Sequence, residues 1–256
     1  MRVAIVRDVP ESIARCELTH MTREPIDVAR AREQHRQFCD VLATLTDALV
    51  ALPPLEEFPD STFVEDPVVV LDEVAILCRS GAASRRGEAA LLEPVVARFR
   101  EILRLEEPAL VDGGDVLCMG RTVYVGQASR SNADGVRQLA DLLSPHGYTV
   151  KPAQTVGCLH LTTGCSRITP ETVMVNPAWV DPATFAADGF DVVACDPAEP
   201  FAANSRLVGN TIVFPAEFER TRQRLEQRGL RLAAVPFGEL AKAEAGPSCA
   251  SLVFEI

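Results

Sequence analysis

The residues best suited to chemistry recur at nearly regular intervals. Asp66, Asp112, His160, Asn204 and Cys249 follow one another at spacings of 44 to 48 residues. A thiolate is a strong nucleophile, a histidine exchanges protons near neutral pH, and a carboxylate beside a histidine keeps it charged. Brought together, these side chains would support nucleophilic catalysis with acid–base assistance.

Taken one at a time, the same residues have simpler explanations. A lone cysteine is usually a small buried hydrophobe, His160 between two leucines suits a core position, and the Asp-Gly-Gly-Asp run at 112–115 suits a turn. Arg85 and Arg130 suit the surface, and Phe63 suits the core. Their shared phase along the chain favours an active site over these separate roles.

The elements that must position these residues form the same repeat. Each unit has a helix, a strand, a polar junction and a hairpin. Hairpins are predicted at 68–78, 115–125, 165–175 and 205–214. A last strand at 250–255 has no hairpin partner after it, so strand 2–7 is expected to complete it. Five units closed by the N-terminal strand predict an α/β fold, a five-bladed propeller whose junctions face one axis. The alternative is an ordinary sheet of alternating strands and helices.

The longest helix is predicted over 26–50, from apolar residues spaced three and four apart. Pro53-Pro54 is predicted to end it. His35 lies off the apolar stripe and is predicted to be a solvated surface residue. The polar residues 16–25 before the helix have no clear period and are predicted to form a loop.

Composition limits the class of protein. The 256 residues are 47% hydrophobic and show no linker, so one catalytic domain over 1–256 is expected. No apolar run approaches the roughly 18 residues of a membrane helix. The N-terminus lacks a signal-peptide pattern, so a cytoplasmic protein with eight reduced cysteines is expected.

Charge and sequence motifs limit the class of ligand that the protein is expected to bind. A net charge of −11 argues against nucleic acid and suits a cationic small molecule. The chain has no CxxC pair, P-loop, GxGxxG or HExxH motif, so neither a metal nor a nucleotide cofactor is predicted.

Six stretches carry a joint resemblance to known proteins: 59–67, 84–86, 112–116, 159–161, 202–204 and 248–249. Together they resemble the dimethylarginine dimethylaminohydrolase family of the guanidino-group-modifying (pentein) superfamily, whose fold is a five-bladed α/β propeller. The resemblance implies a C–N hydrolase that converts asymmetric dimethylarginine or monomethylarginine to citrulline and an amine, through a covalent S-alkylthiouronium on cysteine. Two alternatives stay open: an arginine deiminase or related guanidino or ureido hydrolase, and a non-catalytic binding protein of the same fold.

The resemblance also implies catalytic roles. Cys249 would attack the guanidinium carbon. His160 would protonate the departing amine and then activate water, and Asp112 would hold His160. Asp66 would bind the guanidinium, and Phe63 would flank it.

The remaining implied roles concern the rest of the substrate. Arg85 and Arg130 would pair with its α-carboxylate. Asp60 and Glu65, with the backbone near Leu18 and Ala243, would shape the pocket, and the loop 17–25 would be a lid. No cofactor is implied, although zinc held by Cys249 and His160 would inhibit. The expected partner is a cationic amino acid, bound by a monomer or homodimer.

Overall fold

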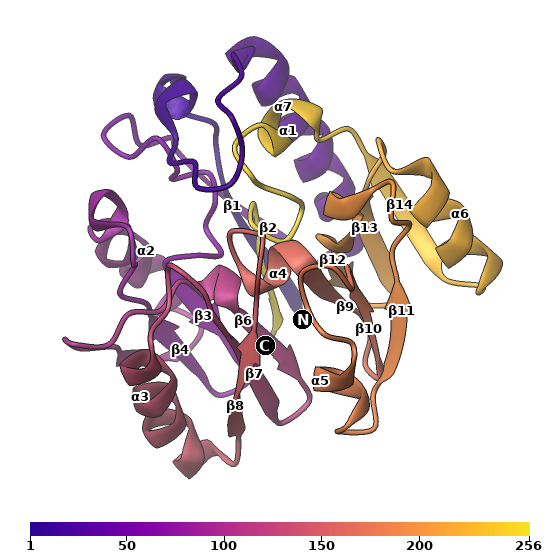
Figure 1. Ribbon diagram of the computed structural model, residues 1–256. Helices are drawn as coiled ribbons and strands as arrows, with labels where there is room; N and C mark the ends of the chain where they lie inside the picture. The colour runs from indigo at the N-terminus through magenta and orange to yellow at the C-terminus, as the bar shows by residue number, and fades with distance from the viewer.

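The computed structural model describes residues 1–256, and its strands form five separate three-stranded sheets around a common centre (Figure 1). The sheets are, in pairing order, β15 (Leu252–Glu255), β1 (Arg2–Arg7) and β2 (Ala48–Leu52); β3 (Val68–Val70), β4 (Val74–Leu77) and β5 (Glu101–Arg104); β6 (Val116–Met119), β7 (Thr122–Gln127) and β8 (Thr149–Gln154); β9 (Cys165–Thr169), β10 (Thr172–Val175) and β11 (Asp191–Ala194); and β12 (Arg206–Val208), β13 (Thr211–Pro215) and β14 (Arg231–Val235). These sheets are the blades of the predicted α/β propeller.

All blades share one connectivity. The middle strand pairs antiparallel with the strand on one side and parallel with the strand on the other. A parallel pair needs a crossover connection, which a helix supplies in each blade. These helices are α1 (Val28–Leu45), α2 (Glu88–Val96), α3 (Ala133–Leu143), α5 (Ala183–Ala186) and α6 (Glu219–Gln227).

The two ends of the chain meet in one blade. β15 pairs antiparallel with β1, with Val3 opposite Phe254 and Ile5 opposite Leu252. The N-terminal ammonium group donates a hydrogen bond to the Ile256 carbonyl at 2.7 Å. The predicted pairing of the last strand with strand 2–7 is therefore confirmed.

The predicted helix 26–50 was too long. α1 ends at Leu45, where the hydroxyl of Thr46 bonds the Leu42 carbonyl, and the chain reverses into β2. β2 pairs parallel with β1. The prediction missed this strand because a short apolar run is compatible both with a strand at a sheet edge and with the apolar face of a helix.

His35 is also not a surface residue, since only 3% of it is exposed. α1 is covered on several sides, by β1, β14, α7 (Gly238–Ala241) and η1 (Glu11–Arg15), so its buried face is wider than one stripe.

Apolar clusters join neighbouring blades. One cluster combines Val69 and Ile76 of the second blade with Val123, Leu139 and Leu143 of the third. Such packing fixes each blade against the next and so fixes the spacing of the junctions. All eight cysteines are free thiols, and no helix is both long and apolar enough to span a bilayer.

Candidate active site

The five junction residues lie between consecutive blades. Asp66 precedes β3, Asp112 precedes β6, His160 precedes β9, Asn204 precedes β12 and Cys249 precedes β15. Asp66, His160 and Cys249 line one cavity. Asp112 contacts His160 and Asn204 contacts Cys249 from outside it, so the structure brings together residues that lie far apart in sequence.

His160 lies between two carboxylates. Its Nε2 is 3.2 Å from Asp112 Oδ2, and its Nδ1 is 3.5 Å from Asp66 Oδ1. Burial disfavours the charged ring, but the negative charge of Asp66 and the hydrogen bond to Asp112 outweigh it and raise the pKa of His160 to about 9. The ring is therefore an imidazolium at neutral pH, ready to act as a general acid.

Asp112 is held in place for this contact. The carboxylate is fully buried, and its Oδ1 accepts a hydrogen bond from the Gly81 N–H at 3.0 Å. Burial opposes its ionisation, yet the hydrogen bond and positive charge of His160 keep the pKa of Asp112 below its usual value.

Glycine is required between the carboxylates. A Cβ on Gly114 would lie 2.6 Å from Asp66 Oδ1 and 2.7 Å from His160 Nδ1, and one on Gly113 would lie 2.0 Å from the Glu65 carbonyl oxygen. The run at 112–115 does form a short turn, η3 (Gly113–Asp115). Its glycines are needed because neighbouring residues come too close to the backbone to leave room for a side chain.

Cys249 is a buried thiol with a fixed orientation. Asn204 donates from Nδ2 to Sγ at 3.3 Å and accepts the Ser248 N–H through Oδ1 at 3.1 Å. Burial first, then the negative charges of Glu65 and Asp66, raise the pKa of Cys249 to about 12. The thiol is therefore protonated at rest, and a cation beside it would favour the thiolate.

The loop predicted to be a lid is held beside a small cavity, which its residue Glu17 helps to line. The volume of this cavity is about 10 Å³, about enough for one water molecule. The Glu244 carboxylate accepts the backbone N–H groups of Thr19, His20 and Met21, and the Asp60 carboxylate accepts that of Glu17 at 3.1 Å. An amino acid does not fit in this volume, so the cavity must widen to take one, and the lid role of the loop stays a prediction.

The two predicted carboxylate-binding arginines differ. The pairing of Arg85 with a substrate α-carboxylate stays a prediction. Arg85 is buried on the cavity wall and bonds Asp66, Glu88 and the carbonyls of Asp60 and Phe63, so most of its donors serve the protein itself. Its charge compensates the buried carboxylates around it. Arg130 lines the cavity and makes only one protein hydrogen bond, to the Thr19 hydroxyl at 3.2 Å.

The other predicted pocket residues separate into two groups. Asp60, Phe63 and Ala243 line the cavity, whereas Leu18 packs against the apolar core. Glu65 faces away from the cavity and accepts hydrogen bonds from the Ser248 and Thr162 hydroxyls at 2.8 and 3.3 Å. It therefore supports the nucleophile loop instead of shaping the pocket directly.

Sequence reasoning placed Asn204 among the converging junction residues, through the phase of the repeat, but gave it no role. It did not point to Glu244. Glu244 has a left-handed φ of 59°, which no sequence pattern announced. No cluster of three or more His, Cys, Asp or Glu side chains has the geometry of a metal site, and zinc at Cys249 and His160 stays a prediction.

Comparison with known proteins identifies the family. No protein-family model matches the chain. The chain is 36% identical to the N(G),N(G)-dimethylarginine dimethylaminohydrolase of Pseudomonas aeruginosa, over 89% of this chain and 90% of that one. It is 34% identical to the Streptomyces coelicolor enzyme of the same name, over 97% and 95%.

Solved structures are similar to this chain over almost its whole length. A Cys→Ser mutant of the P. aeruginosa enzyme complexed with citrulline superposes with a TM-score of 0.94, at 34% identity and 98% coverage of both chains. The N-terminal domain of the arginine dihydrolase ArgZ superposes with a TM-score of 0.88 at 17% identity, covering 99% of this chain and 98% of that one, which supports the fold. The chain therefore belongs to the dimethylarginine dimethylaminohydrolase family.

Proposed function

We propose that the protein hydrolyses Nω-methylated arginine to citrulline and dimethylamine or methylamine. The observation that carries the proposal is the placement of Cys249 and His160, whose ring lies between two carboxylates, on one cavity. The citrulline complex of the P. aeruginosa relative supports the same product.

The cavity suits a cationic amino acid. Asp66 and Asp60 supply negative charge for a guanidinium, and Phe63 supplies an apolar wall. Arg130 has donors left for an α-carboxylate, and Arg85 lines the same cavity with most of its donors bound to the protein's own groups. Binding starts with release of the lid from Glu244 and Asp60.

Substrate binding activates the nucleophile. With a pKa of about 12, roughly one Cys249 thiol in 10⁵ is ionised at pH 7. A guanidinium within reach of Sγ lowers such a pKa by about one to three units. The cation thus raises the thiolate population only when there is something to attack.

The covalent step joins Sγ to the guanidinium carbon. The Cys249 thiol gives up its proton to solvent as this bond forms. The bond from the carbon to the methylated nitrogen breaks, and His160 gives its proton to the departing amine, which takes up a second proton from solvent after release. Neutral His160 then takes a proton from water, the oxygen bonds to the carbon, and the C–S bond breaks. Citrulline leaves, and the thiol is restored.

The test is a parallel assay of citrulline and amine release from dimethylarginine, monomethylarginine and arginine. We expect the methylated substrates to be preferred. Cys249→Ser is expected to abolish release, and Cys39→Ser, a half-buried thiol on α1, serves as the matched control. Preferred release of ammonia from arginine would instead indicate a deiminase.

A further inference from the structure

A second cavity lies on the propeller axis, behind the nucleophile. Its volume is about 140 Å³, room for more than a single water molecule. The first strand of every blade contributes to its wall, through residues of β3, β6, β9, β12 and β15. It shares no lining residue with the active-site cavity. We call it the axial cavity.

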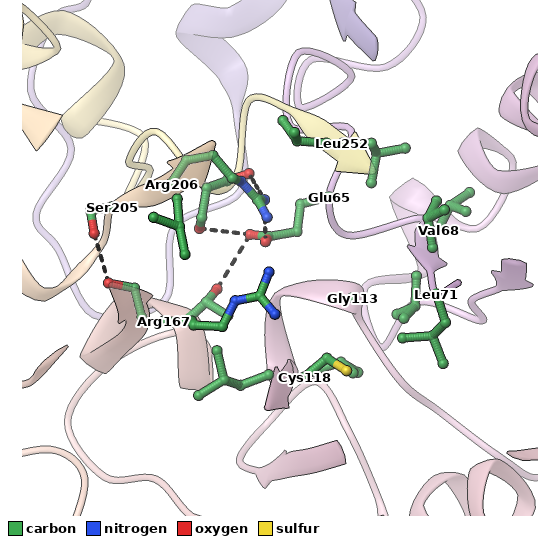
Figure 2. A pocket seen from close by; sticks show the side chains of 18 residues that line it. Glu65, Val68, Leu71, Gly113, Cys118, Arg167, Ser205, Arg206 and Leu252 are labelled. Atoms are coloured by element: carbon green, nitrogen blue, oxygen red, sulfur yellow. Dashed lines mark hydrogen bonds and ion pairs between the residues drawn. The ribbon is translucent and has the colours of Figure 1, made fainter. Parts of the chain in front are cut away.

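The charges of the axial cavity are unbalanced. Arg167 and Arg206 line it, together with one carboxylate, that of Glu65. Figure 2 shows the Arg167 guanidinium extending into the cavity, on the same side as Glu65 and Arg206. Glu65 pairs with Arg206 at 2.6 Å, so the charge of Arg167 has no partner. An acidic protein thus keeps a net positive cavity at its centre.

Arg206 has donors that the chain does not use. Its Nη2 serves Glu65 Oε1, the Ser248 carbonyl and the Ser251 carbonyl. Its Nε is enclosed by the chain without a hydrogen-bond partner, whereas its Nη1 has no partner and is left free to donate. A guanidinium nitrogen without an acceptor in the chain can serve an acceptor from outside it.

Hydroxyl groups complete the lining. Ser166 and Ser205 face each other at 2.7 Å between Oγ atoms, and the Thr162 and Ser248 hydroxyls already serve Glu65. The remaining wall is apolar, from residues such as Val116, Leu207 and Leu252. Two guanidinium groups in a partly apolar cavity are suited to a small oxyanion, because guanidinium groups bond phosphate and carboxylate oxygens in pairs.

We propose that the axial cavity binds a small oxyanion, a phosphate or a carboxylate, between Arg167 and Arg206. The ion would neutralise Arg167 and give the Arg206 side chain a further acceptor. The Arg206 guanidinium also donates a hydrogen bond to the carbonyl of Ser248, next to Cys249. The anion would therefore contact the side chain that holds the nucleophile loop in place.

The test is a ³¹P NMR titration of the protein with inorganic phosphate at constant ionic strength set by chloride, with acetate as a competitor. We expect saturable phosphate binding. Arg167→Ala should weaken it about tenfold or more, the loss expected for a charged hydrogen-bond donor. Because Arg167 is exposed and has no partner, this substitution should leave the fold intact. Displacement by acetate would show that carboxylates share the site, and resistance to acetate would assign it to phosphate.

Two further variants keep the result specific. Arg231→Ala removes an exposed arginine of β14 outside the axial cavity and should leave binding unchanged. Cys118→Asp places a carboxylate on the cavity wall, where it can pair with Arg167, and should block binding. Equal affinity in wild type and Arg167→Ala would overturn the proposal. Unchanged binding in Cys118→Asp would overturn it too, since it would place the ion outside the axial cavity.

Discussion

Replacing Asp112 by Asn tests the origin of the charge on His160. The substitution keeps the shape of the side chain but removes the negative charge 3.2 Å from Nε2. Raising the pKa of His160 from 6.5 to about 9 corresponds to about 3 kcal/mol in favour of the imidazolium, at 1.36 kcal/mol per unit. Asp66, Asp112 and Asp115 share this effect against the cost of burial.

Asp112 should account for about one to three of these units, the range for an opposite charge at this distance. We therefore expect the His160 pKa to fall to roughly 6 to 8 in Asp112→Asn. The fraction of enzyme with a protonated general acid at pH 8 should fall with it.

The assay is ¹⁵N NMR titration of the imidazole groups, together with the pH dependence of kcat/KM. The chain has only four histidines, so His160→Gln assigns the resonance. Asp141→Asn, an exposed carboxylate of α3, is the matched control. A His160 pKa that stays near 9 in Asp112→Asn, or that falls equally in Asp141→Asn, would refute the reasoning.

Three more outcomes follow from the site. Because the pKa of His160 is raised in the folded state, the ring stabilises the fold fully below about pH 6.5, and this stabilisation is lost as the pH rises through about 9. The free energy of unfolding in urea should therefore decrease by about 2 kcal/mol between pH 6.5 and 8.5. In His160→Gln this decrease should disappear. Gly114→Ala should cost about 1 to 3 kcal/mol in urea unfolding and reduce kcat, since its Cβ would lie 2.7 Å from His160 Nδ1; unchanged stability and kcat would contradict this. Glu244→Ala should speed amide exchange at Thr19, His20 and Met21 by about tenfold or more, measured by hydrogen exchange against exposed Glu171→Ala, and equal rates in both variants would exclude Glu244 as the lid anchor.

Much of the fold was predictable because the repeat has two strong local signals. Hairpin turns and helix caps depend on neighbouring residues, so the four hairpins and four of the five parallel third strands were found near their observed positions. β2 was missed because its apolar residues continue the stripe of α1. Only its pairing with β1 distinguishes a strand at these residues from a continuation of the helix.

The junction residues converged as their common phase predicted, but their neighbours did not follow from sequence. Arg85 lines the active-site cavity, but its ion pairs with the buried carboxylates of Asp66 and Glu88 were not predicted. Which carboxylate a buried arginine pairs with depends on tertiary distances that no spacing rule contains. The same is true of Glu244, whose partners lie more than 220 residues away in the chain.

The covalent role of Cys249 can be measured directly by intact-protein mass spectrometry. His160→Gly, mixed with S-methyl-L-thiocitrulline, retains the thiol but lacks the group that activates water. Because methanethiolate leaves without needing a proton from His160, we expect one adduct, with the mass of the substrate less methanethiol, mapped by proteolysis to Cys249. The double variant Cys249→Ser/His160→Gly should show no adduct. An adduct that persists in the double variant, or its absence from His160→Gly in which Cys249 remains reduced, would contradict the assignment of Cys249 as the nucleophile.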